Sequence, residues 1–257
     1  MQHRSRRVAL ITGGSRGIGA ETALALAARG YDIALTYRNK AARAQEVATA
    51  IVQRNVRGLA LACDMTRFAE VASFFRDIKQ WTDHLDAVVL NASGGLEREL
   101  VAADPQYPMH VNRDAQLQFV DAALPLMHQG GVIVFVTSHW AHLYGQMEQV
   151  PAYEPIAASK YAGEQALRSR QDEFAGKGIR LIVITADLVE GTIAPKLLER
   201  IHPGLIARRR TAAGTLPTAA QMGREIASAA SNADLPTGYT LAVGSAPQSM
   251  LFATLST

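Results

Sequence analysis

The sequence predicts a single α/β domain in which helices cover both faces of a parallel sheet. Three observations support this: seven short apolar runs, longer amphipathic stretches between them, and a balanced composition. Of the 257 residues, 48% are hydrophobic and 19% charged, which is typical of a globular chain with a sizeable core. Apolar runs that alternate with helical stretches favour a doubly wound sheet with right-handed crossovers. We therefore expect one domain over residues 1–257.

The predicted strands are short and rich in Val, Ile, Leu and Ala. In chain order they cover residues 8–11, 33–37, 59–63, 87–90, 132–136, 181–185 and 239–243. Helices are expected over 20–28, which Gly30 closes, and over 40–54, before Gly58. Two long irregular stretches, 139–155 and 189–217, interrupt the pattern in the second half. Loops of this length often carry binding function, and we expect 189–217 to form a mobile substrate lid.

The loop after the first strand is predicted to hold the diphosphate of a dinucleotide. It reads Thr12-Gly13-Gly14-Ser15-Arg16-Gly17-Ile18-Gly19 and leads into the first helix. Glycines permit a tight turn and close approach of the backbone, and a helix N-terminus offers free N–H groups to an anion. This context predicts a Rossmann-type fold, with a cofactor held by Gly13, Ser15, Arg16, Gly17, Ile18 and Gly19.

The end of the second strand favours NADP(H) over NAD(H). An NAD-selective site commonly has an acidic residue there that binds the ribose 2′-hydroxyl. This strand instead ends in Tyr37-Arg38-Asn39. Arg38 and Arg16 are suited to a 2′-phosphate, because a guanidinium forms charge-assisted hydrogen bonds with it. We expect Tyr37 and Arg38 to contact the cofactor.

Further motifs follow the later strands. They are Asp64-Met65, Asn91-Ala92-Ser93-Gly94, Asn112 within Val111-Asn112-Arg113, Ser138, and Ser159-Lys160. Together with the glycine loop, they make the chain resemble the short-chain dehydrogenase/reductase family over essentially its whole length. The resemblance implies cofactor contacts from Asp64, Met65, Asn91, Ala92, Lys160 and Thr192, and catalytic roles for Ser138, Lys160 and Asn112. Two motifs depart from the family: Leu90 replaces an asparagine, and Asp187-Leu188 replaces a Pro-Gly pair before Thr192.

The largest departure concerns the catalytic tyrosine. Family members usually carry it four positions before the lysine, where this chain has Ile156. Tyr153, seven positions before Lys160, is the leading replacement, and its spacing resembles that of bacterial enoyl-acyl-carrier-protein reductases. Pro155 disfavours helical angles at the residue before it, so we expect Tyr153 just outside the helix. Tyr144, a water, another side chain, or no proton donor remain the alternatives, while Tyr161 is expected to point away.

The expected mechanism divides the work among these groups. Lys160 would lower the pKa of the tyrosine, and Ser138 would donate to the substrate oxygen. The resemblance implies that Lys160 also holds the nicotinamide ribose and that Asn112 holds a water. Reduction of a small ketone is favoured. Reduction of the C=C bond of an enone or enoyl thioester is the alternative, and a non-catalytic NADP-binding sensor or interaction protein is a third possibility.

Other features limit the partners. A net charge of +3 with dispersed basic residues argues against nucleic-acid binding, and no apolar stretch reaches the length of a membrane span. The single cysteine, Cys63, is expected to be buried, and the polar N-terminus suggests no signal peptide and a cytoplasmic location. His139 and His142 lack a third ligand in register, so no metal is expected and they should line the substrate cleft. The resemblance implies a homodimer or homotetramer, to which the apolar tail 250–253 would contribute.

Overall fold

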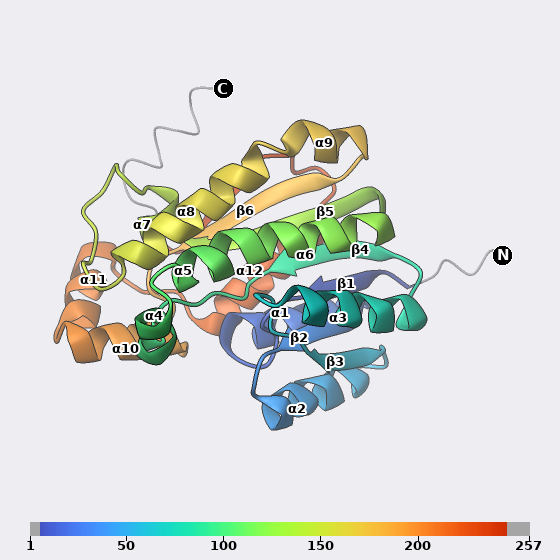
Figure 1. Ribbon diagram of the computed structural model, residues 1–257, viewed down its shortest axis with the longest axis horizontal. Helices are drawn as coiled ribbons and strands as arrows, with labels where there is room; N and C mark the ends of the chain where they lie inside the picture. The colour runs from blue at the N-terminus through green and yellow to red at the C-terminus, as the bar shows by residue number, and fades with distance from the viewer. Residues whose placement is uncertain (1–5, 246–257) are drawn as a thin grey trace.

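The computed structural model describes residues 6–245 and confirms the predicted parallel sheet (Figure 1). The strands are β1 (Val8–Ile11), β2 (Asp32–Tyr37), β3 (Gly58–Ala62), β4 (Leu85–Leu90), β5 (Met127–Ser138), β6 (Arg180–Ala186) and β7 (Thr240–Val243). Their order across the sheet is β3-β2-β1-β4-β5-β6-β7, with every neighbouring pair parallel. The order reverses between β1 and β4, and a crevice at this switch point is where such sheets bind ligands.

Helices cover both faces of the sheet. One face carries α1 (Gly17–Ala27), α2 (Ala41–Val52) and α12 (Ala219–Ser231), and the other carries α3 (Phe68–Trp81), α6 (Ala115–Ala123), α8 (Glu154–Arg168) and α9 (Gln171–Gly176). Shorter elements lie in the connections: α4 (Arg98–Ala103), α5 (Tyr107–Met109), η1 (His110–Asp114), η2 (Leu124–Leu126) and α7 (His139–His142). Among the described residues, no helix combines the length and apolar character needed to cross a bilayer.

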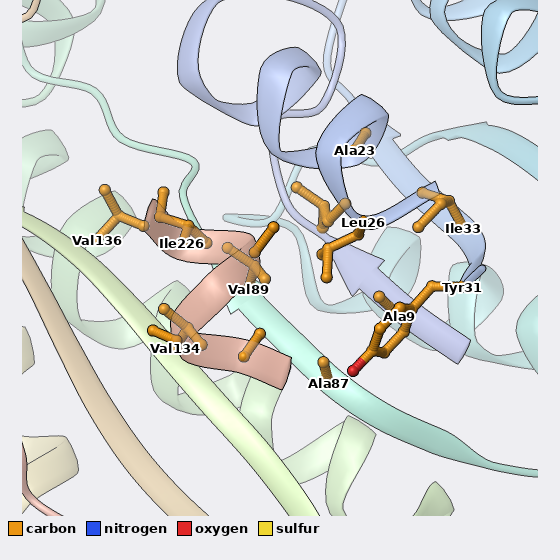
Figure 2. Close-up of a cluster of buried hydrophobic side chains, with 14 of the residues drawn as sticks. Ala9, Ala23, Leu26, Tyr31, Ile33, Ala87, Val89, Val134, Val136 and Ile226 are labelled. Carbon is orange, nitrogen blue, oxygen red and sulfur yellow. The ribbon is translucent and has the colours of Figure 1, made fainter. Parts of the chain in front are cut away.

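Two apolar layers anchor the sheet because successive strand residues point to opposite faces. Along β1, Ala9 and Ile11 join one cluster, and Val8 and Leu10 join the other. Figure 2 shows the first cluster, in which side chains of α1 and α12 meet residues of the central strands. All four residues of β1 are fully buried, so the sheet is a rigid platform for the loops at its carboxyl edge.

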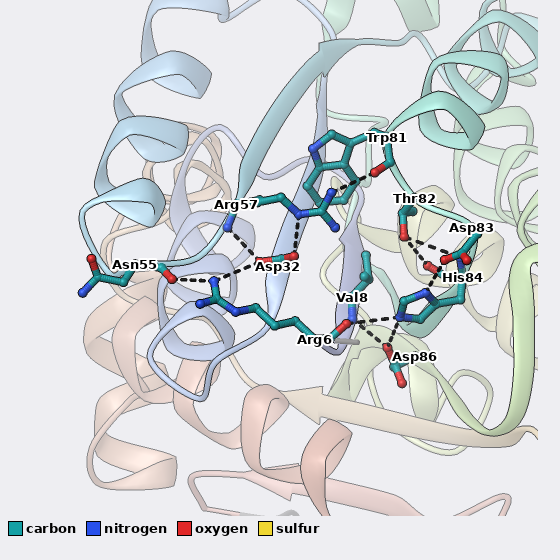
Figure 3. A network of polar contacts seen from close by, with 10 residues as sticks. All are labelled: Arg6, Val8, Asp32, Asn55, Arg57, Trp81, Thr82, Asp83, His84 and Asp86. Carbon is teal, nitrogen blue, oxygen red and sulfur yellow. Dashed lines mark hydrogen bonds and ion pairs between the residues drawn. The ribbon is translucent and has the colours of Figure 1, made fainter. Parts of the chain in front are cut away.

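A polar network fastens the opposite, amino-terminal edge of the sheet (Figure 3). Asp32, at the start of β2, accepts a 2.6 Å hydrogen bond from Arg57 Nε, and the Arg57 guanidinium lies 4.5 Å from the centre of the Trp81 ring. At the start of β1, the Val8 N–H donates to Asp86 Oδ2 at 2.6 Å. These charged groups stabilise the fold, and they lie at the edge of the sheet away from the switch-point crevice.

One expectation about the second half of the chain was wrong. The stretch 189–217, predicted to be irregular, contains two helices, α10 (Ile193–Ile201) and α11 (Leu205–Ala213). Gly204 separates them in the left-handed conformation, with φ of 81°, which lets the chain reverse within a short turn. The predicted strands and first helices are confirmed to within a few residues, although β5 begins at Met127. The apolar tail 250–253 lies outside the described residues.

Candidate functional site

The glycine loop between β1 and α1 forms a cradle that only glycine fits. Gly13 and Gly17 have φ of 67° and 56°, a region that other residues rarely adopt. A Cβ atom at Gly19 would lie 2.4 Å from the carbonyl oxygen of Gly13, and one at Gly14 would lie 2.6 Å from Cβ of Leu35. The backbone is thus packed as closely as the approach of a diphosphate to a helix N-terminus requires, and the loop fits a dinucleotide.

Hydrogen bonds fix this cradle to the neighbouring strands. Thr12 Oγ1 accepts from the N–H groups of both Asn91 and Ala92 at 2.9 Å, and Asn91 Nδ2 donates to the Thr12 carbonyl at 3.0 Å. On the other side, the Gly13 N–H donates to Thr36 Oγ1 at 3.1 Å. The loop is therefore tied to β2 and β4, the two strands that flank β1.

Thr192, the expected nicotinamide contact, lies close to the phosphate cradle. It directly precedes α10, and its Oγ1 donates to the Val189 carbonyl at 2.7 Å. Its Cγ2 is 3.5 Å from the place where a Cβ of Gly17 would stand. The connection after β6 thus meets the cradle from the far side of the crevice.

The pocket at the end of β2 differs from the expected two-arginine clamp. Arg38 donates from Nη1 to the Tyr107 hydroxyl at 2.5 Å and from Nη2 to Glu97 Oε1 at 3.2 Å. Arg16 is exposed at the start of α1 and forms no part of this group. An acidic residue therefore does lie beside the end of β2, although it comes from the loop after β4. Sequence spacing gave no signal for Glu97 at this place.

Arg38, Asp64 and Glu97 line one cavity of about 460 Å³ beyond the ends of β2 and β3. Asp64 is held there by its own turn, because its Oδ1 accepts from the N–H and hydroxyl of Thr66 at 3.0 and 2.7 Å. The neighbouring Met65 is buried. The cavity therefore lies next to Arg38, Asp64 and Met65, which were expected to contact the cofactor.

Tyr153 and Ser138 come together at the carboxyl edge of the sheet. Ser138 ends β5, and Tyr153 directly precedes α8, which begins at Glu154 with Pro155 in its first turn. The placement of Tyr153 just outside the helix is thus confirmed. Its hydroxyl donates to Ser138 Oγ at 3.2 Å, so two hydroxyl groups converge on one point.

The alternatives to Tyr153 are placed differently. Ile156, where the family has its tyrosine, is only 3% exposed and packs in an apolar cluster with Tyr153 and Trp140. Tyr144 faces Tyr161, with ring centres 5.9 Å apart. Of these tyrosines, Tyr153 is the one that hydrogen-bonds Ser138.

Burial raises the pKa of the Tyr153 phenol, and the hydrogen bond with Ser138 opposes this shift only in part. The expectation that Lys160 holds this pKa below its usual value was therefore wrong for the protein alone. The physical reason is the surroundings of the ring, which lies 5.4 Å from the centre of Trp140 in an apolar cluster. A phenol in such surroundings keeps its proton at neutral pH.

Lys160 is buried on α8, one helical turn before a buried carboxylate. Burial lowers the pKa of its ammonium to about 8, and the charge of Glu164 acts in the opposite direction. Glu164 Oε1 accepts from Arg168 Nε at 2.9 Å and lies 2.7 Å from His142 Nδ1. The spacing of four residues between Lys160 and Glu164 was a signal that sequence reasoning missed.

Asn112 joins the loop after β4 to α8. It lies in the π-helical turn η1, and its Nδ2 donates to the Gly94 carbonyl at 2.9 Å and to Ser159 Oγ at 3.0 Å. A Cβ at Gly163 would lie 2.2 Å from the Asn112 carbonyl oxygen, so α8 and η1 are in close contact. The amide therefore fixes the backbone on both sides of the crevice.

The two histidines after Ser138 have separate partners. His139 Nδ1 lies 3.0 Å from Thr185 Oγ1, and burial lowers the pKa of His139 to about 4, so its ring is neutral at pH 7. His142 instead pairs with Glu164. Within residues 6–245, no three His, Cys, Asp or Glu side chains group as metal ligands would. Cys63 is buried as expected, and burial raises its thiol pKa to about 12.

Ion pairs connect α11 to the end of β6. Arg209 forms a forked pair with the buried Asp187, with Nε 3.0 Å from Oδ2, and its guanidinium lies over the Trp140 ring. Arg210 pairs with Glu190 at 2.7 Å. Asp187 is one of the residues that depart from the family pattern, and its partner Arg209 lies 22 positions later.

A glycine cradle between β1 and α1 of a doubly wound parallel sheet is typical of the Rossmann-type class of dinucleotide-binding domains. Residues 7–201 match the family model described as short chain dehydrogenase, and the chain belongs to the short-chain dehydrogenase family. The match covers most of the chain, from β1 to the end of α10.

Relatives and solved structures that are similar to the chain are named as reductases or short chain dehydrogenases. The chain is 30% identical over 191 residues to 1-cyclohexenylcarbonyl-CoA reductase of Streptomyces collinus, covering 72% of this chain and 65% of that protein. It is 32% identical over 205 residues to hydroxynaphthalene reductase arp2 of Aspergillus fumigatus, covering 78% and 72%. A short chain dehydrogenase from Burkholderia cenocepacia in complex with NADP superposes with a TM-score of 0.79 at 26% identity, covering 93% and 96%. The match to the Streptomyces enzyme spans slightly less than two thirds of its length.

Proposed function

We propose that this protein is an NADPH-dependent reductase that transfers hydride to the carbonyl carbon of a small organic ketone. The 3.2 Å hydrogen bond between the Tyr153 hydroxyl and Ser138 Oγ carries the proposal. Two hydroxyl groups at one point can bind a single carbonyl oxygen, one as a hydrogen-bond donor and the other as the acid. Support for NADP(H) comes from Arg38 at the end of β2 and from the NADP in the Burkholderia structure.

The bound cofactor supplies the hydride, and the chain supplies position and charge. The glycine cradle would hold the diphosphate through backbone N–H groups, and Thr192 lies beside the cradle at the start of α10. Ser138 donates a hydrogen bond to the substrate oxygen and stabilises the negative charge that develops there. Tyr153 transfers its phenolic proton to that oxygen, and the raised pKa keeps this proton available at neutral pH.

Lys160 and Asn112 act behind the hydroxyl pair. Lys160, buried on α8, would bind the nicotinamide ribose and orient the ring. Asn112 holds the Gly94 loop against α8, which keeps the lysine and the loop after β4 in register. The loss of activity expected from altering either residue comes from misplaced groups as well as lost charge.

Reduction of a conjugated C=C bond is the second candidate. The name of the Streptomyces relative denotes a conjugated enoyl thioester, and the seven-residue separation of Tyr153 and Lys160 resembles that of enoyl reductases. In that reaction the two hydroxyls would stabilise an enolate oxygen. Incubation of the protein with NADPH and matched panels of ketones and enones separates the two reactions. We expect NADPH oxidation with ketones, giving alcohols that mass spectrometry identifies. Turnover of enones alone, with saturated products, would establish the second reaction.

We also propose that α10 and α11 form a substrate lid, which the pair between Asp187 and Arg209 closes. Asp187→Asn should lower the free energy of unfolding by about 2 kcal/mol, since breaking buried pairs costs roughly 3–5 kcal/mol and Arg209 is partly exposed. We also expect faster tryptic cleavage within 193–213. Glu190→Gln is the control, because its partner Arg210 is exposed and the change should stay below about 1 kcal/mol. Equal effects of both variants would contradict the proposed closure.

A further inference from the structure

The acidic side chain beside Arg38 is the feature that the proposed function leaves unexplained. Glu97 Oε1 accepts from Arg38 Nη2 at 3.2 Å, while its other oxygen accepts from the Gly95 N–H at 2.7 Å. The carboxylate is therefore held on both sides, by a guanidinium and by its own backbone turn. That turn is rigid at its start, since a Cβ at Gly95 would lie 2.7 Å from Ile156 Cγ1.

Both terminal nitrogens of Arg38 already have a partner. Its Nη1 donates to the Tyr107 hydroxyl at 2.5 Å, and its Nη2 is occupied by Glu97. Tyr107 is buried, so the hydroxyl is a fixed support. The side chains of Arg38 and Glu97 remain 35% and 36% exposed, which makes Glu97 the partner that can leave for solvent.

We infer that Glu97 is a cofactor-selectivity gate: its carboxylate occupies, on Arg38, the place that the 2′-phosphate of NADP(H) needs, and must be released for that phosphate to bind. This inference rests on the proposed use of NADP(H). A carboxylate on Arg38 disfavours a phosphate beside it, because like charges about 4 Å apart repel by roughly 4 kcal/mol near a protein surface. An exposed ion pair such as Arg38–Glu97 contributes only about 0–1 kcal/mol to stability. A phosphate attracts Arg38 more strongly than the carboxylate does, because it carries nearly twice the charge. The phosphate therefore displaces Glu97, at a cost in affinity that NAD(H) does not bear.

Binding measured without turnover tests the gate. NADPH and NADH are titrated separately into the full-length protein, with the change in nicotinamide fluorescence as the readout. Glu97→Gln keeps the size and removes the charge, and we expect the Kd for NADPH to fall about five- to tenfold while the Kd for NADH changes less than twofold. Glu46→Gln is the matched control, because Glu46 is an exposed carboxylate on α2 that does not line this cavity. It should change either Kd less than twofold.

A double-variant cycle assigns the effect to the Arg38 pair. In an Arg38→Met background, Glu97→Gln should no longer tighten NADPH binding selectively. A wild-type protein that prefers NADPH but is unchanged by Glu97→Gln would overturn the gate and leave the proposed function intact. A wild-type protein that prefers NADH, and loses NADH affinity in Glu97→Gln, would overturn both, since Glu97 would then be a ribose ligand. Thermal unfolding of each variant establishes that the compared proteins are folded.

Discussion

Replacement of Tyr153 by Phe is expected to lower kcat about 10²–10⁴-fold, the usual contribution of a positioned general acid. The reason is local, because the hydroxyl that meets Ser138 at 3.2 Å is the group that the variant lacks. The ring itself stays packed on Trp140, so the fold should lose only about 1 kcal/mol for one hydrogen bond. Steady-state kinetics with NADPH and the best ketone of the panel provide the measurement, and NADPH binding should be unchanged.

The matched control is Tyr144→Phe. Tyr144 pairs with the ring of Tyr161 and does not contact Ser138, so its hydroxyl should be dispensable. Undiminished turnover by Tyr153→Phe would show that the proton comes from elsewhere. A large loss in Tyr144→Phe would identify Tyr144 as the proton donor.

The direction of reaction gives a second readout. Because the pKa of Tyr153 is raised, alcohol oxidation, which needs the phenolate as base, should reach its optimum at a higher pH than ketone reduction.

Features that depend on local physics could be predicted from the sequence. The glycine cradle is one, because the positive φ of Gly13 and Gly17 is a backbone requirement that few other residues meet. The position of Tyr153 is another, since Pro155 suits the first turn of a helix and α8 begins at Glu154, directly after Tyr153. The strands follow from runs of apolar residues that must be buried on both faces.

Features that depend on which loops meet could not be predicted. Glu97 and Arg38 are 59 positions apart, and only the path of the loop after β4 brings them together. The helical pair α10 and α11 was also missed, because Pro195, Pro203 and Gly204 read as breaks in a helical pattern. The raised pKa of Tyr153 depends on burial against residues from several elements, which spacing along one helix cannot supply.

Replacement of Lys160 by Met is expected to abolish turnover and yet stabilise the protein. Met nearly conserves the shape of the aliphatic stem, and it removes an ammonium whose pKa is lowered to about 8 by burial. The lysine is charged in the unfolded chain up to about pH 10.5. Below pH 8 the folded state therefore holds a proton in an unfavourable place, at a cost of roughly 3 kcal/mol. This cost decreases as the pH rises from 8 to 10.5 and is absent above that range.

The variant should therefore gain up to about 3 kcal/mol in free energy of unfolding at pH 7, and the gain should shrink toward pH 10. Urea unfolding at pH 7 and 9.5 measures both values, and Lys79→Met, at an exposed position, should change stability by less than about 0.5 kcal/mol. The same titration predicts that wild-type kcat/KM falls as the pH rises through about 8, because Lys160 then loses its proton. Glu164 keeps Arg168 and His142 as partners when Lys160 is replaced, so its buried charge remains compensated. A Lys160→Met protein that is less stable than wild type at pH 7 would mean that the ammonium is held by favourable contacts, and that it is not a strained group kept for catalysis.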